Sequence, residues 1–258
     1  MGQDFDGQTA VVTGSSSGIG AAIARRFAEA GADVVTNSRS AERAEEVAAE
    51  IREAGGSAVG VGADVTDHDA VAALADAAIE EFGSLDVMIN NAGMTIVEDA
   101  VDYTPEQWRQ VIDVDLTGTF FGAQAAGQRM IEQGTGGAVV NVSSLLGTKG
   151  LAGRSPYCAA KSGVDNLTRT LAVEWADHDV RVNGLAPGYV RTEITDQSME
   201  SAGYTVEDIE ARTPLGRFAR PEEMAECALF LARPDTFVTG EILTADGGWS
   251  ANAWGPDH

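Results

Sequence analysis

The chain has 258 residues, 44% of them hydrophobic, and its 17 basic and 40 acidic residues give a formal net charge of −23. This charge argues against a nucleic-acid partner, because phosphate binding requires basic surfaces. No apolar run approaches the roughly 18 residues of a membrane span, so we expect no membrane association.

The charge is spread through all the helix-like segments, and only Lys149 and Lys161 are lysines. Dense surface carboxylates repel one another at low ionic strength and are screened in molar salt. We therefore favour a protein adapted to a salty cytoplasm over an ordinary acidic protein. The acidic, polar residues 1–6 lack the basic and apolar regions of a signal peptide, so we expect a cytoplasmic location.

Cysteine and histidine do not cluster in this chain. Cys158 and Cys227 are far apart, and the three histidines are scattered. The sequence therefore predicts neither a disulfide framework nor a metal site.

From the N-terminus, short β-branched runs alternate with long Ala-rich amphipathic stretches, which is typical of βαβ units around a parallel sheet. The sequence predicts strands at residues 9–12, 34–37, 58–61, 87–90, 138–142, 181–186 and 242–244. It predicts helices at about residues 18–30, 41–54, 67–82, 105–133, 155–177 and 221–232.

No linker or repeat interrupts this alternation, which indicates one α/β domain over residues 1–258. We expect a doubly wound, mostly parallel sheet of seven strands with helices on both faces. The only long irregular stretch, at about residues 189–220, is a candidate substrate loop, because doubly wound folds bind ligands at the carboxyl ends of their strands.

The first predicted strand runs into a glycine-rich turn, residues 13–20, and then into the first helix. Such a turn lets the backbone approach a pyrophosphate at the positive end of the helix. The expected cofactor-binding residues of this turn are Gly14, Ser16, Ser17, Gly18, Ile19 and Gly20.

The same turn also matches the pattern G-x-S-x-G, in which Ser16 would be the nucleophile of a serine hydrolase. That alternative needs His178 or His258 as its base, and no earlier strand is present to complete an oxyanion hole. It is therefore less favoured, as is a purely structural glycine turn.

The end of the second predicted strand indicates which dinucleotide fits. An acidic residue there would bind the ribose 2′-hydroxyl of NAD, but the chain has Ser38 and Arg39 instead. Arg39 could accept a 2′-phosphate, which favours NADP over NAD, although a solvated surface arginine is the alternative. After the third strand, Asp64, next to Val65, could bind the adenine amino group or could simply be a turn residue.

The fifth predicted strand ends at the pair Ser143 and Ser144, and Tyr157 and Lys161 follow on a helix. Residues four apart share one helix face, so the phenol and the ammonium point the same way. A cation beside a phenol lowers its pKa from about 10 toward the working range of a general base. The alternative is that Tyr157 is a half-buried structural tyrosine and Lys161 is a surface lysine, neither with a catalytic role.

Together these motifs resemble the single-domain branch of the short-chain dehydrogenase/reductase family over essentially the whole chain. The matching positions are residues 13–20, residues 90–93, Ser144, Tyr157 with Lys161, and residues 187–192. The resemblance implies a Rossmann-like fold in which Tyr157 exchanges the proton with the substrate oxygen. It also implies that Lys161 lowers the pKa of Tyr157 and holds the nicotinamide ribose, and that Ser144 polarises the substrate carbonyl.

The resemblance further implies cofactor contacts from both remaining motifs. They are Asn91, Ala92 and Gly93 beside the adenosine, and Pro187, Gly188, Val190 and Thr192 beside the carboxamide.

One position departs from the family pattern. Asp115 stands where the family usually has Asn. The family Asn is thought to act largely through its backbone carbonyl, which holds a water in the proton relay to Lys161, and Asp115 could provide the same carbonyl. We therefore expect catalysis to be retained, with Asp115 as a fourth catalytic residue.

The combined prediction is an NADP(H)-linked oxidoreductase acting on a small secondary alcohol or ketone. The sequence resembles both 3-oxoacyl thioester reductases and sugar or polyol dehydrogenases. Met199, Tyr204 and Ile209 could line an apolar substrate pocket or could pack a lid on its own helix. A cofactor-binding sensor or scaffold without catalysis is the non-enzymatic alternative, and the presence of both Tyr157 and Lys161 disfavours it.

The resemblance also implies a homo-oligomer, often a tetramer. Candidate contacts are Phe120, Phe121, Trp249 and Trp254, although core packing explains aromatic side chains equally well.

Overall fold

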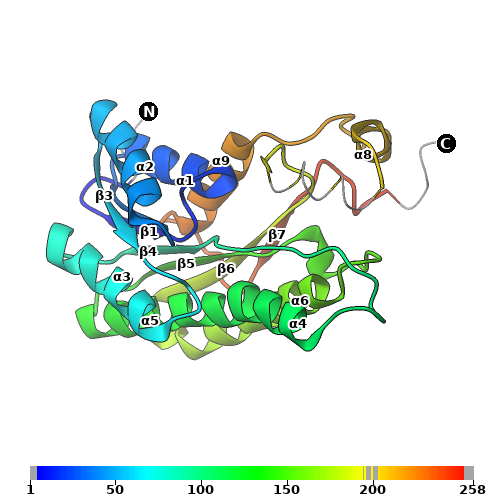
Figure 1. Ribbon diagram of the computed structural model, residues 1–258. Helices are drawn as coiled ribbons and strands as arrows, with labels where there is room; N and C mark the ends of the chain where they lie inside the picture. Colours follow the sequence, from blue (N-terminus) through cyan, green and yellow to red (C-terminus); the bar gives the residue numbers. More distant parts are fainter. Residues whose placement is uncertain (1–4, 194, 196–198, 200–202, 253–258) are drawn as a thin grey trace.

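A computed structural model describes residues 5–193, 195, 199 and 203–252. Its seven strands form one parallel sheet in the order β3-β2-β1-β4-β5-β6-β7 (Figure 1). The strands are β1 (Thr9–Val12), β2 (Asp33–Ser38), β3 (Ser57–Gly62), β4 (Val87–Asn90), β5 (Gly137–Val142), β6 (Val180–Pro187) and β7 (Ile242–Ala245). Every predicted strand is therefore confirmed, with its ends correct to within one residue.

Helices cover both faces of this sheet. On one face lie α1 (Gly18–Glu29), α2 (Ala41–Glu53) and α9 (Pro221–Ala232) (Figure 1). On the other lie α3 (His68–Phe82), α4 (Pro105–Ile112), α5 (Gly118–Gln133) and α6 (Ser155–Glu174). The short helix α8 (Val206–Arg212) stands beyond the carboxyl ends of the strands.

The central strands are mostly apolar and almost entirely buried, as expected where helices pack on both faces of a parallel sheet. Val12, Ile89 and Val140 belong to the core under α1 and α9. Val11, Met88 and Val139 belong to the second core, under α3, α5 and α6. Alternate residues of one strand thus fill opposite cores.

Two expectations about the elements were wrong. The predicted helix 105–133 is interrupted by a π-helical turn, Asp113–Thr117, between α4 and α5. The stretch 189–220 is not the only long irregular one, because residues 91–104 after β4 also form neither helix nor strand, and α8 lies within 189–220. Among the described residues, no helix is long and apolar enough to cross a membrane.

The strand order reverses between β1 and β4, which are neighbours in the sheet. In doubly wound sheets, the crevice for a ligand opens at this point, outside the carboxyl ends of the strands. The glycine turn after β1, the loop after β4, Ser144 after β5 and the segment after β6 all lie at that edge. The fold therefore brings the separate sequence motifs together.

Candidate active site

The glycine turn after β1 forms a cradle lined by backbone. Gly14 and Gly18 have φ angles of +61° and +55°, which side-chain-bearing residues rarely adopt. A Cβ on Gly14 would lie 2.8 Å from the Cα atom of Ala92, and one on Gly20 would lie 2.4 Å from the Gly14 carbonyl oxygen. Bulkier residues would fill the cradle.

Helix α1 opens onto this cradle. Its N-cap residue, Ser17, makes no side-chain capping hydrogen bond, and its first turn holds no acidic residue. The N–H groups and the positive dipole at this end therefore favour an anion. The cradle and the helix end together fit the pyrophosphate of a dinucleotide.

The loop after β4 holds the glycine turn in place through hydrogen bonds. Thr13 Oγ1 accepts hydrogen bonds from the backbone N–H groups of Asn91 and Ala92, at 3.0 and 3.1 Å. The Asn91 amide donates to the carbonyls of Thr13 and Gly14, at 3.0 and 3.1 Å. Asn91 and Ala92, expected as cofactor contacts, thus hold the turn in shape.

Two arginines lie close to the end of β2, namely Arg39 directly after the strand and Arg43 in the following helix. Arg39 is exposed and lines a shallow depression with Ser38, Ser40 and Arg43. Arg43, in the first turn of α2, was missed from the sequence because an isolated helical arginine carries no motif. The depression has the charge and open shape that a ribose phosphate needs.

The geometry of Asp64 is that of a turn residue, which was the alternative interpretation. Its Oδ1 accepts from the backbone N–H and the hydroxyl of Thr66, at 2.9 and 2.8 Å. These hydrogen bonds and the nearby charge of Arg39 lower the pKa of Asp64. Its neighbour Val65 is buried, and its side chain packs against Gly118.

Ser144, Tyr157 and Lys161 come together at the carboxyl end of β5. Ser144 is the N-cap of a short 3₁₀ helix, Leu145–Gly147, and its hydroxyl lies close enough to the Tyr157 phenol to lower the pKa of that phenol. On α6, the Lys161 ammonium lies 5.4 Å from the centre of the Tyr157 ring. Lys161 is only 3% exposed and donates to the Val142 carbonyl at 3.0 Å, so it is not the surface lysine of the alternative reading.

The side chain of Asp115 lies next to Lys161 and so belongs to the same cluster as Ser144, Tyr157 and Lys161. It lies in the π-helical turn and is fully buried, with its Oδ1 3.1 Å from the ammonium of Lys161. Its Oδ2 accepts from the backbone N–H of Met94 at 3.0 Å. A Cβ on Gly93 would lie 2.9 Å from Oδ1, so Gly93 makes room for the carboxylate.

The pKa of the Tyr157 phenol differs from the expectation. Burial raises it, Lys161 lowers it, and Asp115 raises it again, so that the pKa lies above its ordinary value. The effect of Lys161 has the expected direction, but desolvation outweighs it. Burial lowers the pKa of Lys161, yet Asp115 and Tyr157 more than compensate and raise it, so the ammonium stays charged.

The segment after β6 closes the crevice over the glycine turn. Thr192 lies against the turn, because a Cβ on Gly18 would come within 3.3 Å of its Cγ2. Val190 is buried and forms an isolated bridge with Ala219, and Gly188 packs against Asp246. Pro187 ends β6 and is also buried.

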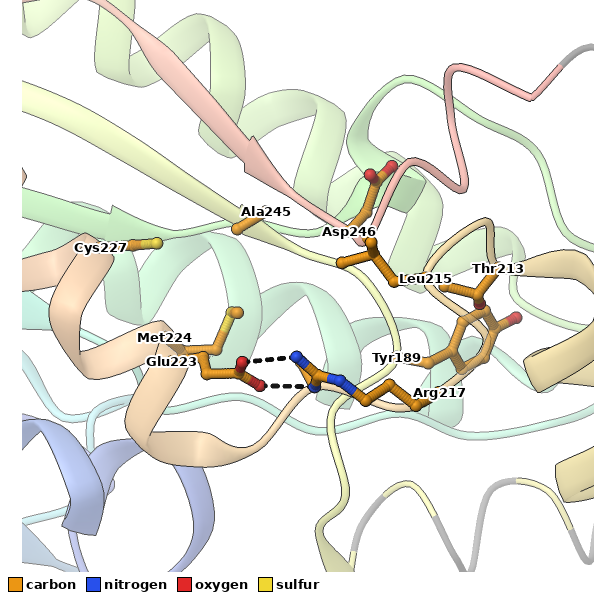
Figure 2. A pocket seen from close by; sticks show the side chains of 11 residues that line it. Tyr189, Thr213, Leu215, Arg217, Glu223, Met224, Cys227, Ala245 and Asp246 are labelled. Carbon is orange, nitrogen blue, oxygen red and sulfur yellow. Dashed lines mark hydrogen bonds and ion pairs between the residues drawn. The ribbon is translucent and has the colours of Figure 1, made fainter.

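Met199 and Ile209 are buried against Phe218 in a small separate cluster, with Tyr204 and Tyr189 at its margin. These residues therefore pack the loop on itself, which was the alternative to a substrate-pocket lining. Tyr189 also contributes to a cavity of about 200 Å³ between α9 and the end of β7. Figure 2 shows this cavity, with the paired Arg217 and Glu223 at its wall.

None of Ser144, Tyr157 and Lys161 lines that cavity, so the catalytic candidates and the cavity are separate features. Within the described part of the chain, Ser16 has no histidine or carboxylate hydrogen-bond partner, and His258, one of the two candidate bases of a hydrolase, lies outside the described residues. Likewise, no metal-binding cluster of His, Cys, Asp and Glu occurs among these residues.

Sequence reasoning missed a buried arginine at the start of α6. Arg154 stands directly before α6, one turn ahead of Tyr157, and is 3% exposed. Burial raises the pKa values of Tyr103 and Tyr189, and the charge of Arg154 opposes both shifts. Arg154 differs from the surface arginines of the chain only in its burial, and burial of an arginine could not be predicted from the sequence.

The predicted interface aromatics have contacts within the chain. Phe121 packs edge-on against His68, at 5.2 Å between ring centres, and Trp249 lies 6.1 Å from Tyr189. Phe120 is partly exposed, at 36%. Trp254 lies outside the described residues.

Comparisons with known proteins agree with this geometry. Residues 14–250 match the family model described as enoyl-(acyl carrier protein) reductase. A cis-4-hydroxycyclohexanecarboxylate dehydrogenase of Sinomonas cyclohexanicum is 48% identical over 97% of this chain and 100% of that protein.

Two solved structures share the whole fold. A short-chain type dehydrogenase/reductase from Mycobacterium marinum has a TM-score of 0.92 and 36% identity, over 97% of this chain and 98% of the other. A gluconate 5-dehydrogenase from Burkholderia cenocepacia, in complex with NADP and tartrate, has a TM-score of 0.91 and 35% identity, over 97% and 99% of the two chains.

Proposed function

The chain belongs to the short-chain dehydrogenase/reductase family of oxidoreductases, which act on CH–OH groups, and we propose that it transfers a hydride between NADP(H) and a secondary alcohol or ketone. The observation that carries this proposal is the convergence of Ser144, Tyr157 and Lys161 at the sheet edge where the glycine turn opens α1. A dinucleotide cradle without a proton donor would suit a sensor instead, and here both parts are present.

When bound, a nicotinamide dinucleotide supplies the hydride chemistry. In the reducing direction, the Tyr157 phenol donates its proton to the substrate oxygen, and in the oxidising direction the phenolate accepts it. The Ser144 hydroxyl, which lies near that phenol, orients the substrate oxygen beside it. Lys161 keeps a positive charge next to the phenol and so favours the phenolate.

The residues for the cofactor follow from the same edge. The backbone of residues 18–20 would hold the pyrophosphate, and Thr192 would close over it. Arg39 and Arg43 would bind a 2′-phosphate, which supports NADP over NAD. NAD remains the alternative cofactor.

For the substrate, we favour a sugar-like or alicyclic alcohol that carries a carboxylate over a 3-oxoacyl thioester. Two relatives are named for hydroxy acids, a hydroxycyclohexanecarboxylate and gluconate. The irregular stretch 189–220 would cover the substrate.

Matched substrates test this preference. With NADP, the initial rate of oxidation should be higher for cis-4-hydroxycyclohexanecarboxylate than for cyclohexanol. Faster turnover of a 3-oxoacyl thioester than of any hydroxy acid or its ketone would contradict the substrate proposal and leave the reaction class intact.

We also propose that the protein forms a homo-oligomer. Large apolar side chains are exposed on two sides, including Trp108 and Val173 on α4 and α6, and Phe230 on α9. Exposed apolar surface of this kind is typical of protein interfaces. Light scattering after gel filtration would show a mass above the 26.8 kDa of one chain, whereas a monomer would contradict the proposal.

A further inference from the structure

Asp115 makes all its contacts in the interior of the protein. Its carboxylate reaches Lys161 at 3.1 Å through Oδ1 and the Met94 N–H at 3.0 Å through Oδ2. Its backbone carbonyl accepts the hydroxyl of Thr119 at 2.9 Å. The carbonyl thus already has a protein donor, and the carboxylate is the part aimed at the catalytic lysine.

We propose that the Asp115 carboxylate is a positioning residue that fixes Lys161 and offsets its positive charge at the Tyr157 phenol. The inference rests on the proposed function, in which that phenol is the general acid and base. It differs from the expected role of Asp115, which was limited to its backbone carbonyl.

The ammonium of Lys161 has three N–H donors. The Val142 carbonyl accepts one of them, and the Asp115 carboxylate lies 3.1 Å from the nitrogen, so the remaining donors serve the ion pair and a ribose hydroxyl or a water. Because Lys161 is 3% exposed and Asp115 is fully buried, neither contact can be exchanged readily for solvent. The pair of Asp115 and Lys161 therefore fixes the orientation of the Lys161 ammonium. It also determines the net electrostatic field that reaches the Tyr157 phenol.

Among the described residues, few other charged groups lie around the pair of Asp115 and Lys161. On α6, Asp165 faces Lys161 and accepts a hydrogen bond from Ser143, with Arg169 nearby. Around the phenol, Ser144 and Cys158 complete the polar surroundings. Of these groups, Asp115 is the one that acts directly on both Lys161 and Tyr157.

The carboxylate of Asp115 and the ammonium of Lys161 act on the phenol in opposite senses. Burial raises the pKa of Tyr157, Lys161 lowers it, and Asp115 raises it. An uncharged residue at position 115 would leave the field of Lys161 less opposed, and the phenol would ionise at lower pH. Asp115 thus keeps Tyr157 protonated at neutral pH, which suits donation of a proton to a ketone.

Asp115→Asn tests the proposal, because Asn is nearly isosteric and can still accept the Met94 N–H. The pH at which alcohol oxidation reaches half its maximal kcat should fall by about one unit relative to wild type. The matched control is Asp113→Asn on the same π-helical turn, where the exposed carboxylate should leave the profile unchanged. An unshifted or alkaline-shifted profile in a folded Asp115→Asn protein would overturn the proposal.

A second measurement does not depend on activity or on a cofactor. The phenolate absorbance of the cofactor-free protein, minus that of Tyr157→Phe, reports the ionisation of Tyr157 alone. Its midpoint should lie above the ordinary value of about 10 in wild type and should fall in Asp115→Asn. A wild-type midpoint at or below 10 would overturn the proposal even if the Asn variant does not fold. If wild type turns over no substrate, the proposed function fails, while this titration still decides the role of Asp115.

Discussion

The side-chain amide of Asn91 donates a hydrogen bond of 3.1 Å to the backbone carbonyl of Gly14. This bond joins the loop after β4 to the glycine turn after β1, across the point where the strand order reverses. The same two groups crowd Gly20, since a Cβ there would lie 2.4 Å from the Asn91 amide nitrogen and from the Gly14 oxygen. The shape of the cradle therefore depends on this contact and on a bare α-carbon.

Gly20→Ala should weaken both the fold and the cradle. We expect a loss of about 1 to 3 kcal/mol in the free energy of unfolding, because the added methyl group overpacks a site bounded by backbone. We also expect the Kd for NADPH, measured by fluorescence titration, to rise at least tenfold. Gly150→Ala is the matched control, because a Cβ there meets nothing within 4 Å, and it should change neither quantity.

Arg39→Ser should reduce the preference for NADP. Loss of a charge-assisted hydrogen bond to the 2′-phosphate should raise KM for NADP about tenfold, with little change in KM for NAD. Arg109→Ser, at an exposed arginine of α4, is the control. Equal changes for the two cofactors would show that Arg39 does not distinguish them.

The stability of the fold should increase with salt. The formal net charge of −23 makes the surface carboxylates repel one another, and salt screens that repulsion. The melting temperature should therefore be higher in about 2 M KCl than in about 0.1 M KCl. A melting temperature that is highest in dilute buffer would rule out the salt-adapted interpretation.

Glu223 should make part of the stability dependent on pH. Two hydrogen bonds from Arg217, helped by the Arg220 N–H, lower the pKa of Glu223 to about 2. A carboxylate with a lowered pKa stabilises the fold above its ordinary pKa and loses that contribution as pH falls through the lowered one. In chemical denaturation, wild type should thus have a higher free energy of unfolding than Glu223→Gln. This difference should be largest at about pH 6 and should vanish near pH 2.

The neighbouring Glu222→Gln provides the control for this measurement, because Glu222 is exposed on the same first turn of α9. It should show no comparable pH-dependent difference. A difference between Glu223→Gln and wild type that is constant with pH would mean that the ion pair with Arg217 does not contribute to stability.

The strands were predictable because β-branched residues buried on both faces leave a short, continuous apolar signal in the sequence. The π-helical turn at Asp113–Thr117 left no such signal, because its residue types also fit an α-helix. It shifts the register of the helix at Asp115, the residue that then faces Lys161. The site therefore departs from sequence expectation at the point where the backbone departs from regular geometry.

The contacts between separate elements could not be predicted for a related reason. Tyr157 and Lys161 share a helix face by spacing alone, so their pairing could be predicted. Asp115 and Lys161 lie on different elements, and their 3.1 Å approach depends on the packing of the π-helical turn against α6. The burial that raises the pKa of Tyr157, and the burial of Arg154, arise in the same way from packing.

The most direct test of the central claim is the absorbance of reduced nicotinamide, followed for wild type and Tyr157→Phe with NADP and a panel of hydroxy acids, sugars and polyols. Wild type should turn over at least one of them, faster at alkaline pH, and Tyr157→Phe should lose activity about 100-fold or more while still binding NADPH. Turnover by Tyr157→Phe at the wild-type rate would contradict the assignment of Tyr157 as the proton donor and acceptor.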